Sequence, residues 1–109
     1  MNIENSKLIL ALLLINKGEV LNNSYKLMRI LEWQFRIIDS KTLLDQIKEE
    51  QYVEYEIING VHYYKLTLGG KKLIGQEYNT ALELLLKEYP KETDIITSLF
   101  KSFSQEIKD

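Results

Sequence analysis

The spacing of apolar residues divides the chain into five helical stretches and one β-hairpin. The first stretch, residues 5–17, is apolar on nearly every face, so we expect a helix that lies at the centre of the fold or is covered by a partner. Asn5 or Ser6 can cap its start, and Lys17-Gly18 is typical of a helix end. Each of the other predicted helices has one apolar stripe, and together they cover residues 24–33, 40–50, 68–89 and 91–107.

The later helices are bounded by capping and helix-breaking residues. Asp39 or Ser40 can cap the helix over 40–50, and Thr67 caps the next one. Pro90 ends that next helix, because proline lacks the backbone N–H that a helix interior needs. Residues 34–38 are rich in β-prone side chains, so an extended connection is expected there.

Residues 52–58 and 61–67 flank Asn59-Gly60, which is the strongest short hairpin signal. A two-residue turn fixes the strand pairing, and it places Glu54 opposite Lys65. We expect Tyr63 to point outward and Tyr55 and Tyr64 to lie in the core. The apolar face of the hairpin is predicted to carry Val53, Tyr55, Ile57, Tyr64 and Leu66.

The composition indicates one intracellular domain. The chain has 109 residues, of which 45% are hydrophobic, and it has no cysteine. A disulfide framework, a thiolate metal site and a cysteine nucleophile are therefore excluded. The longest apolar run, Leu8 to Ile15, is too short to span a bilayer. We expect a cytoplasmic protein of the α+β class, mostly α, without a membrane segment.

The order of three helices, a hairpin and two further helices resembles the winged helix-turn-helix fold, a three-helix core followed by a β-hairpin wing. The chain ends its hairpin with the sequence Tyr64-Lys65-Leu66-Thr67-Leu68-Gly69-Gly70, after a leucine-rich helix containing Leu43-Leu44-Asp45-Gln46-Ile47. This is similar to the wing of MarR-type and PadR-type transcriptional regulators. In those families a small residue leads into the wing, where this chain has Glu50-Gln51. The resemblance implies a winged-helix domain over residues 1–75, with C-terminal helices over 76–109 packed on it.

The resemblance further implies a transcriptional regulator that binds double-stranded DNA. The helix over 40–50 would enter the major groove, and the wing would touch the backbone or the minor groove. A homodimer would place two such helices about 34–36 Å apart. Lysine can contact phosphate or guanine, and glutamine can read adenine. The candidate DNA-binding residues are Lys41, Thr42, Gln46, Lys48, Arg36, Asn59 and Lys65.

The apolar stripes of the last two helices exceed what a small winged domain needs to cover. We therefore expect these helices to form a two-fold homodimer. The candidate interface residues are Tyr78, Leu82, Leu85, Leu86, Tyr89, Leu99, Phe100 and Phe103.

The charge distribution keeps a second hypothesis open. The net charge is −2, and residues 49–60 contain four glutamates and no basic residue. A DNA-binding surface is usually basic. An acidic wing instead favours a winged helix that serves as a protein-interaction module or an assembly subunit, without binding DNA.

Catalysis is not expected. His62 is the only histidine, and its predicted place in the hairpin indicates a packing or solvent role. The pairs Glu49-Glu50 and Glu54/Glu56 are expected on a solvated face. Without a nucleophile–base pair or a ligand cluster, we predict no enzyme activity, no metal and no cofactor.

Overall fold

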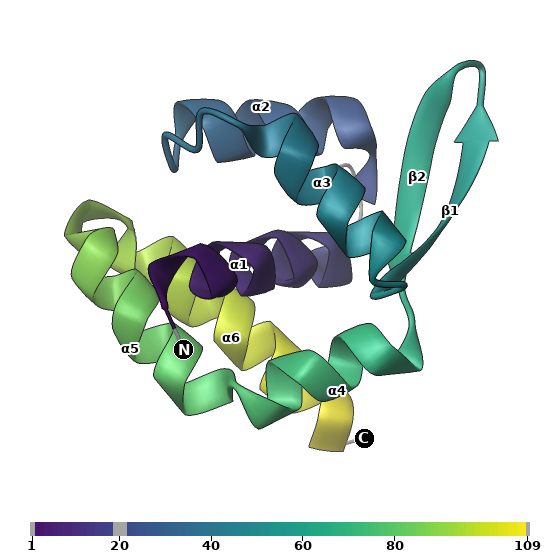
Figure 1. Cartoon of the computed structure of the whole chain (residues 1–109). Coiled ribbons are helices and arrows are strands. Elements are labelled where there is room, and N and C mark those ends of the chain that lie inside the picture. The colour runs from purple at the N-terminus through teal and green to yellow at the C-terminus, as the bar shows by residue number, and fades with distance from the viewer. Residues whose placement is uncertain (1, 19–21, 109) are drawn as a thin grey trace.

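The computed structural model describes residues 2–18 and 22–108, and it places a hairpin after three helices (Figure 1). This part of the chain is mostly helical, and its one sheet has two antiparallel strands. The elements are α1 (Ile3–Lys17), α2 (Ser24–Trp33), α3 (Ser40–Glu49), β1 (Val53–Ile58), β2 (Val61–Leu66), α4 (Leu68–Gln76), α5 (Tyr78–Glu88), the short 3₁₀ turn η2 (Pro90–Glu92) and α6 (Thr93–Lys108).

Helix α1 is the centre of the molecule, as its all-round apolar sequence predicts. All eight residues from Leu8 to Ile15 are buried, and α1 packs against β2 and every other α-helix. Its start was predicted wrongly: the helix begins at Ile3, and the Asn2 side chain accepts a hydrogen bond from the Asn5 N–H. The Ser6 hydroxyl instead donates to the carbonyl of Ile3. Gly18 ends the helix with φ +73°, as expected.

Helices α2 and α3 lie where the sequence places them, but the connection between them is not extended. It coils back on the end of α2, where the Ile37 N–H donates to the carbonyl of Leu31. Phe35 and Ile37 are buried in this turn, while Ile38 is fully open to solvent. The burial of these two side chains, with the Phe35 ring edge-on to that of Tyr89, outweighs the β preference of the segment.

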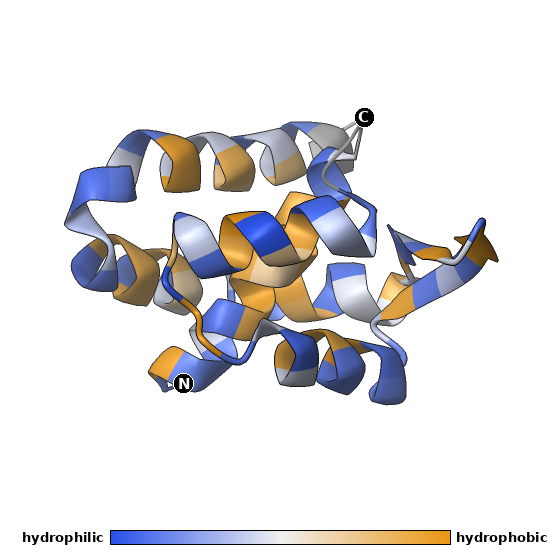
Figure 2. Cartoon of the chain, turned by 90° about the horizontal axis from the view of Figure 1, so that it is seen from above, coloured by the Kyte–Doolittle hydropathy of each residue, from blue (hydrophilic) through white to orange (hydrophobic). Residues whose placement is uncertain are grey.

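The strand pairing is confirmed in full, with Glu54 opposite Lys65 and Ile58 opposite Val61. Asn59 and Gly60 have φ values of +51° and +81°, the conformation of a type I′ turn. On β2 Tyr64 is buried, because β2 packs against α1 and α2. Tyr55, directly opposite on β1, and Ile57 are 51% and 59% exposed, so the prediction of Tyr55 as core is wrong. The hairpin projects past the helices, and the β1 side of its apolar face is left largely uncovered (Figure 2).

The predicted helix over 68–89 is wrong in one respect, because it breaks at Glu77 into α4 and α5. The break turns α5 so that it packs against α1 and α6 (Figure 1). The Tyr78 hydroxyl then donates to the carbonyl of Phe100 and accepts from the Ser104 hydroxyl. Contacts between distant residues therefore offset the helical hydrogen bonds lost at the break.

The apolar stripes of the C-terminal helices cover α1 within the same chain. Leu85, Leu99, Phe100 and Phe103 are all at most 2% exposed, and they belong to the same core as the first three helices. Tyr78, Leu82, Leu86 and Tyr89 are partly buried against that core. The surplus of apolar surface from which the homodimer was inferred is therefore absent here, and the dimer stays a prediction.

Gln51 adopts a backbone conformation that favours glycine. Its φ is +61°, at the point where α3 turns into β1, and its N–H donates to the carbonyl of Lys48. A side chain in this region costs about 1–2 kcal/mol. Glycine would adopt this conformation without that cost.

We predict that Gln51→Gly raises the free energy of unfolding by about 1 kcal/mol, because it removes this strain. Urea unfolding followed by circular dichroism measures the change. The control is Glu50→Gly at the adjacent residue, where φ is −78°. That variant should be destabilised, since glycine only adds freedom to the unfolded chain. Equal effects of the two substitutions would contradict the explanation.

Candidate nucleic-acid interface

Helix α3 leaves one side free next to the hairpin (Figure 1). Leu44 and Ile47 are buried and fix its inner side. The capping residue Asp39 makes no side-chain hydrogen bond to the helix start. Lys41, Thr42 and Gln46 are exposed on the outer side, as the amphipathic pattern predicts.

Asp45 holds both lysines of α3. Its carboxylate is 3.0 Å from the ammonium of Lys41 and 3.4 Å from that of Lys48. The hydrogen bond from Lys41 is the largest of the effects that lower the pKa of Asp45 below 3.8, so this carboxylate is ionised at neutral pH. Burial raises the pKa of the nearby Tyr64 to about 12, and the charge of Asp45 contributes to the rise.

Lys48 connects α3 to the hairpin. Its ammonium lies 5.3 Å from the centre of the Tyr55 ring, and its side chain is only 21% exposed. The Tyr55 ring stacks on His62 of the opposite strand, with 5.2 Å between ring centres. Lys48 thus packs between Asp45 and an aromatic ring, whereas the sequence places it among the free DNA contacts. Lys41 is the more accessible lysine, with 78% of its side chain exposed.

The other predicted DNA-binding residues are only partly brought together. Arg36 is exposed in the turn before α3, and with Thr42 and Gln46 it lines a hollow of about 440 Å³. Asn59 is exposed at the far tip of the hairpin. Lys65 lies on the opposite face of the hairpin from Tyr55, away from α3, so it does not join this group.

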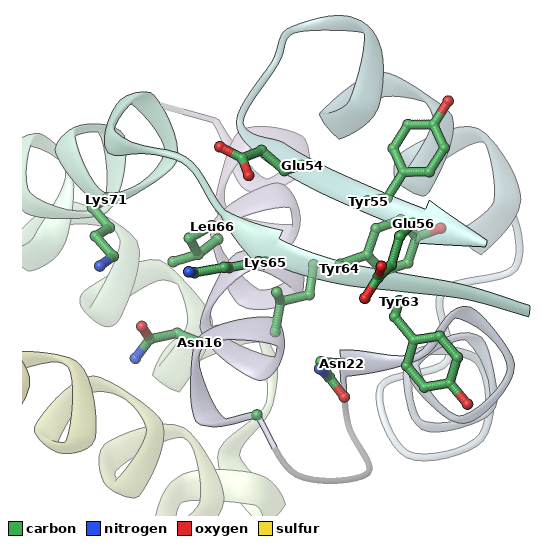
Figure 3. A pocket seen from close by; sticks show the side chains of 12 residues that line it. Asn16, Asn22, Glu54, Tyr55, Glu56, Tyr63, Tyr64, Lys65, Leu66 and Lys71 are labelled. Carbon is green, nitrogen blue, oxygen red and sulfur yellow. The ribbon is translucent and has the colours of Figure 1, made fainter. Parts of the chain in front are cut away.

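A second hollow, of about 530 Å³, lies between the end of α1 and the outer face of the hairpin (Figure 3). Two carboxylates, from Glu54 and Glu56, and two ammonium groups, from Lys65 and Lys71, are among its lining side chains. Asn16 and Tyr63 add polar groups. The described residues that line it include no serine, threonine or histidine that could work as a nucleophile or a base.

Sequence reasoning missed two features beside the interface. Arg29 lies 5.7 Å from the Trp33 ring centre on the exposed side of α2, and their spacing of four residues is a usable sequence signal. Asn23 forms an isolated antiparallel bridge with Tyr63, which fastens β2 to the start of α2. Tyr63 is accordingly half-buried and not fully exposed to solvent. No local sequence pattern predicts that bridge.

Among the described residues, no three His, Cys, Asp or Glu side chains gather closely enough to hold a metal ion. None of the helices in the described ranges is both long and apolar enough to cross a bilayer. Comparisons with protein-family models, curated proteins and solved structures find no match for this chain.

Proposed function

We propose that this chain is a winged helix-turn-helix protein that binds double-stranded DNA through α3 and acts as a transcriptional regulator. The observation that carries the proposal is the exposed side of α3, which is uncovered and directly beside a projecting hairpin (Figure 1). In helix-turn-helix proteins the second helix of the motif lies in the major groove. Here α2 and α3 would form that motif, and the hairpin would be the wing.

The proposed contacts come from the outer side of α3. Lys41 binds phosphate, and Gln46 and Thr42 face the base edges. Asp45 competes with phosphate for Lys41 and Lys48. Ion pairs at an exposed surface contribute little, so a phosphate oxygen displaces the carboxylate at small cost.

The homodimer belongs to the same proposal. A two-fold dimer would set two α3 helices about 34–36 Å apart, as successive major grooves require. Its interface would have to use surface other than Leu85, Leu99, Phe100 and Phe103, which are buried in one chain.

Binding to duplex DNA tests the proposal through Lys41→Ala. We expect this variant to bind several-fold more weakly and to lower the slope of log K against log salt by about 1, because one phosphate contact is lost. Fluorescence anisotropy of a labelled mixed-sequence duplex at several salt concentrations gives both values. The control is Lys87→Ala, which removes an exposed lysine of α5 on the other side of α1 (Figure 1).

Asp45→Asn should change binding in the opposite direction. It removes a negative charge from α3 and releases Lys41 and Lys48 for phosphate, so affinity and salt slope both rise. Failure of the wild-type protein to bind duplex DNA at low salt would end the proposal. Equal losses in Lys41→Ala and Lys87→Ala would remove α3 as the contact surface.

One observation favours a second function, a protein-interaction module. Asp45 and Glu49 lie one turn apart on the exposed side of α3, and Glu54 and Glu56 are exposed on β1. These carboxylates repel phosphate and attract basic protein segments.

A further inference from the structure

The hairpin has one free edge. The far edge of β2 is partly covered, because Tyr63 bridges to Asn23 and β2 packs against α2. In the part of the chain that the structure describes, β1 pairs with β2 alone, and Glu54 to Ile58 are all exposed. Figure 1 shows β1 on the outer side of the hairpin. An edge of this kind is a template for another strand.

The strand pairing shows which backbone groups point outward. Ile58 and Val61 flank a two-residue turn, so they exchange hydrogen bonds with each other. Because this pattern alternates along an antiparallel ladder, Glu54 and Glu56 also direct their backbone groups to β2. Tyr55 and Ile57 therefore direct their N–H and C=O groups away from β2, toward the free edge.

The side chains of β1 define what fits beside it. On one face Tyr55 and Ile57 are 51% and 59% exposed, and they offer apolar contact. On the other face Glu54 and Glu56 offer two carboxylates. A strand added to this edge would place residues opposite these glutamates in non-hydrogen-bonded pairs, where side chains approach most closely. Basic residues at those positions form favourable cross-strand pairs.

A second copy of this chain fits poorly. Two β1 strands in an antiparallel pair centred on Tyr55 would set Glu54 against Glu56 of the other copy. A pair centred on Glu56 would set that carboxylate against its equivalent. Like charges directly opposite one another are destabilising. A pair centred on Ile57 avoids both contacts, but it joins only residues 56–58 of the two strands.

We propose that the free edge of β1 binds an extended segment of another protein in which lysine or arginine alternates with apolar residues. Backbone hydrogen bonds to Tyr55 and Ile57 hold the segment, and Glu54 and Glu56 select its basic residues. This is strand addition, a known mode of peptide recognition. It is independent of DNA binding through α3, because it uses the hairpin edge and not Lys41.

The probe for the test is a blocked synthetic peptide, Thr-Lys-Val-Lys-Val-Lys-Thr, titrated at low ionic strength and followed by amide NMR. We expect saturable binding, with slower hydrogen exchange at the amides of Tyr55 and Ile57. The double variant Glu54→Lys/Glu56→Lys should bind about tenfold more weakly, because two attractive pairs become repulsive. It should instead bind the peptide of reversed charge, Thr-Glu-Val-Glu-Val-Glu-Thr.

The matched control is Glu83→Lys/Glu88→Lys, which makes the same change in net charge at exposed positions of α5. This control should bind the basic peptide nearly as well as the wild type does. Binding that leaves exchange at Tyr55 and Ile57 unchanged, or that falls equally in both double variants, would overturn the proposal. The same protection arising without peptide as protein concentration rises would assign the edge to a second copy, and protection by duplex DNA would assign it to nucleic acid.

Discussion

Gly70→Ala is expected to lower the free energy of unfolding by about 2–4 kcal/mol, because a Cβ atom at this position would collide with the carbonyl oxygen of Tyr52. Gly70 lies in the first turn of α4, pressed against the chain just before β1. The same Tyr52 carbonyl accepts the Thr67 N–H, which closes the base of the hairpin. The atoms that would collide belong to the backbones of α4 and Tyr52, so no flexible side chain can move aside.

The Thr67 hydroxyl adds to the rigidity of this junction. It accepts the Gly70 N–H and donates to the carbonyl of Gln51. The threonine and glycine that close the hairpin therefore join three segments, the ends of α3 and β2 and the start of α4. Moving α4 away from Tyr52 to admit a methyl group would strain all of these bonds.

Gly75→Ala is the matched control, because a Cβ atom there meets nothing within 4 Å. Alanine is the better helix former, so the free energy of unfolding of this variant should rise by about 0.5–1 kcal/mol. Urea unfolding followed by circular dichroism compares the two. If the two variants prove equally stable, the close approach of α4 to Tyr52 does not exist in solution.

The parts of the fold that follow from local chemistry were predictable from the sequence. Asn59-Gly60 admits a two-residue turn, and alternation then leaves one pairing of the strands. The break at Glu77 was not predictable in this way. No proline marks it and Gly75 lies inside α4, so the break depends on where Tyr78 meets Phe100, 22 residues further along the chain. The exposure of Tyr55 likewise depends on which strand the helices cover, since Tyr64 directly opposite it is buried.

The candidate site divides in the same manner. The outward side of α3 follows from the inward positions of Leu44 and Ile47, and the ion pairs of Asp45 follow from spacings of three and four residues. The position of Lys48 over Tyr55 joins two elements, so no local pattern predicts it. Successive side chains of β2 point to opposite faces of the hairpin, so the sequence already indicates that Lys65 lies on the face away from α3.

Phe100→Ala is expected to cost about 3–5 kcal/mol of unfolding free energy, since it empties a packed position in the core. Phe100 is 1% exposed, and its ring meets Tyr78 edge-on with 5.0 Å between centres. Domains of this kind are stable by about 5–15 kcal/mol, so the loss is a large share of the total. The control is Lys101→Ala, an exposed residue of the same helix, which should stay within about 0.5 kcal/mol of the wild type.

The same measurement decides whether the C-terminal stripes serve one chain or two. If Phe100 belongs to the core of a single chain, each protein keeps its own urea midpoint when its concentration is varied about a hundredfold. This holds for the wild type and for the less stable variant. A Phe100→Ala loss below about 1 kcal/mol would contradict the tight packing of Phe100. A midpoint that climbs with concentration in the wild type but not in the variant would show that a second chain completes this core. In that case the dimer would use the stripes of α5 and α6 after all, and α1 would be covered partly by a neighbour.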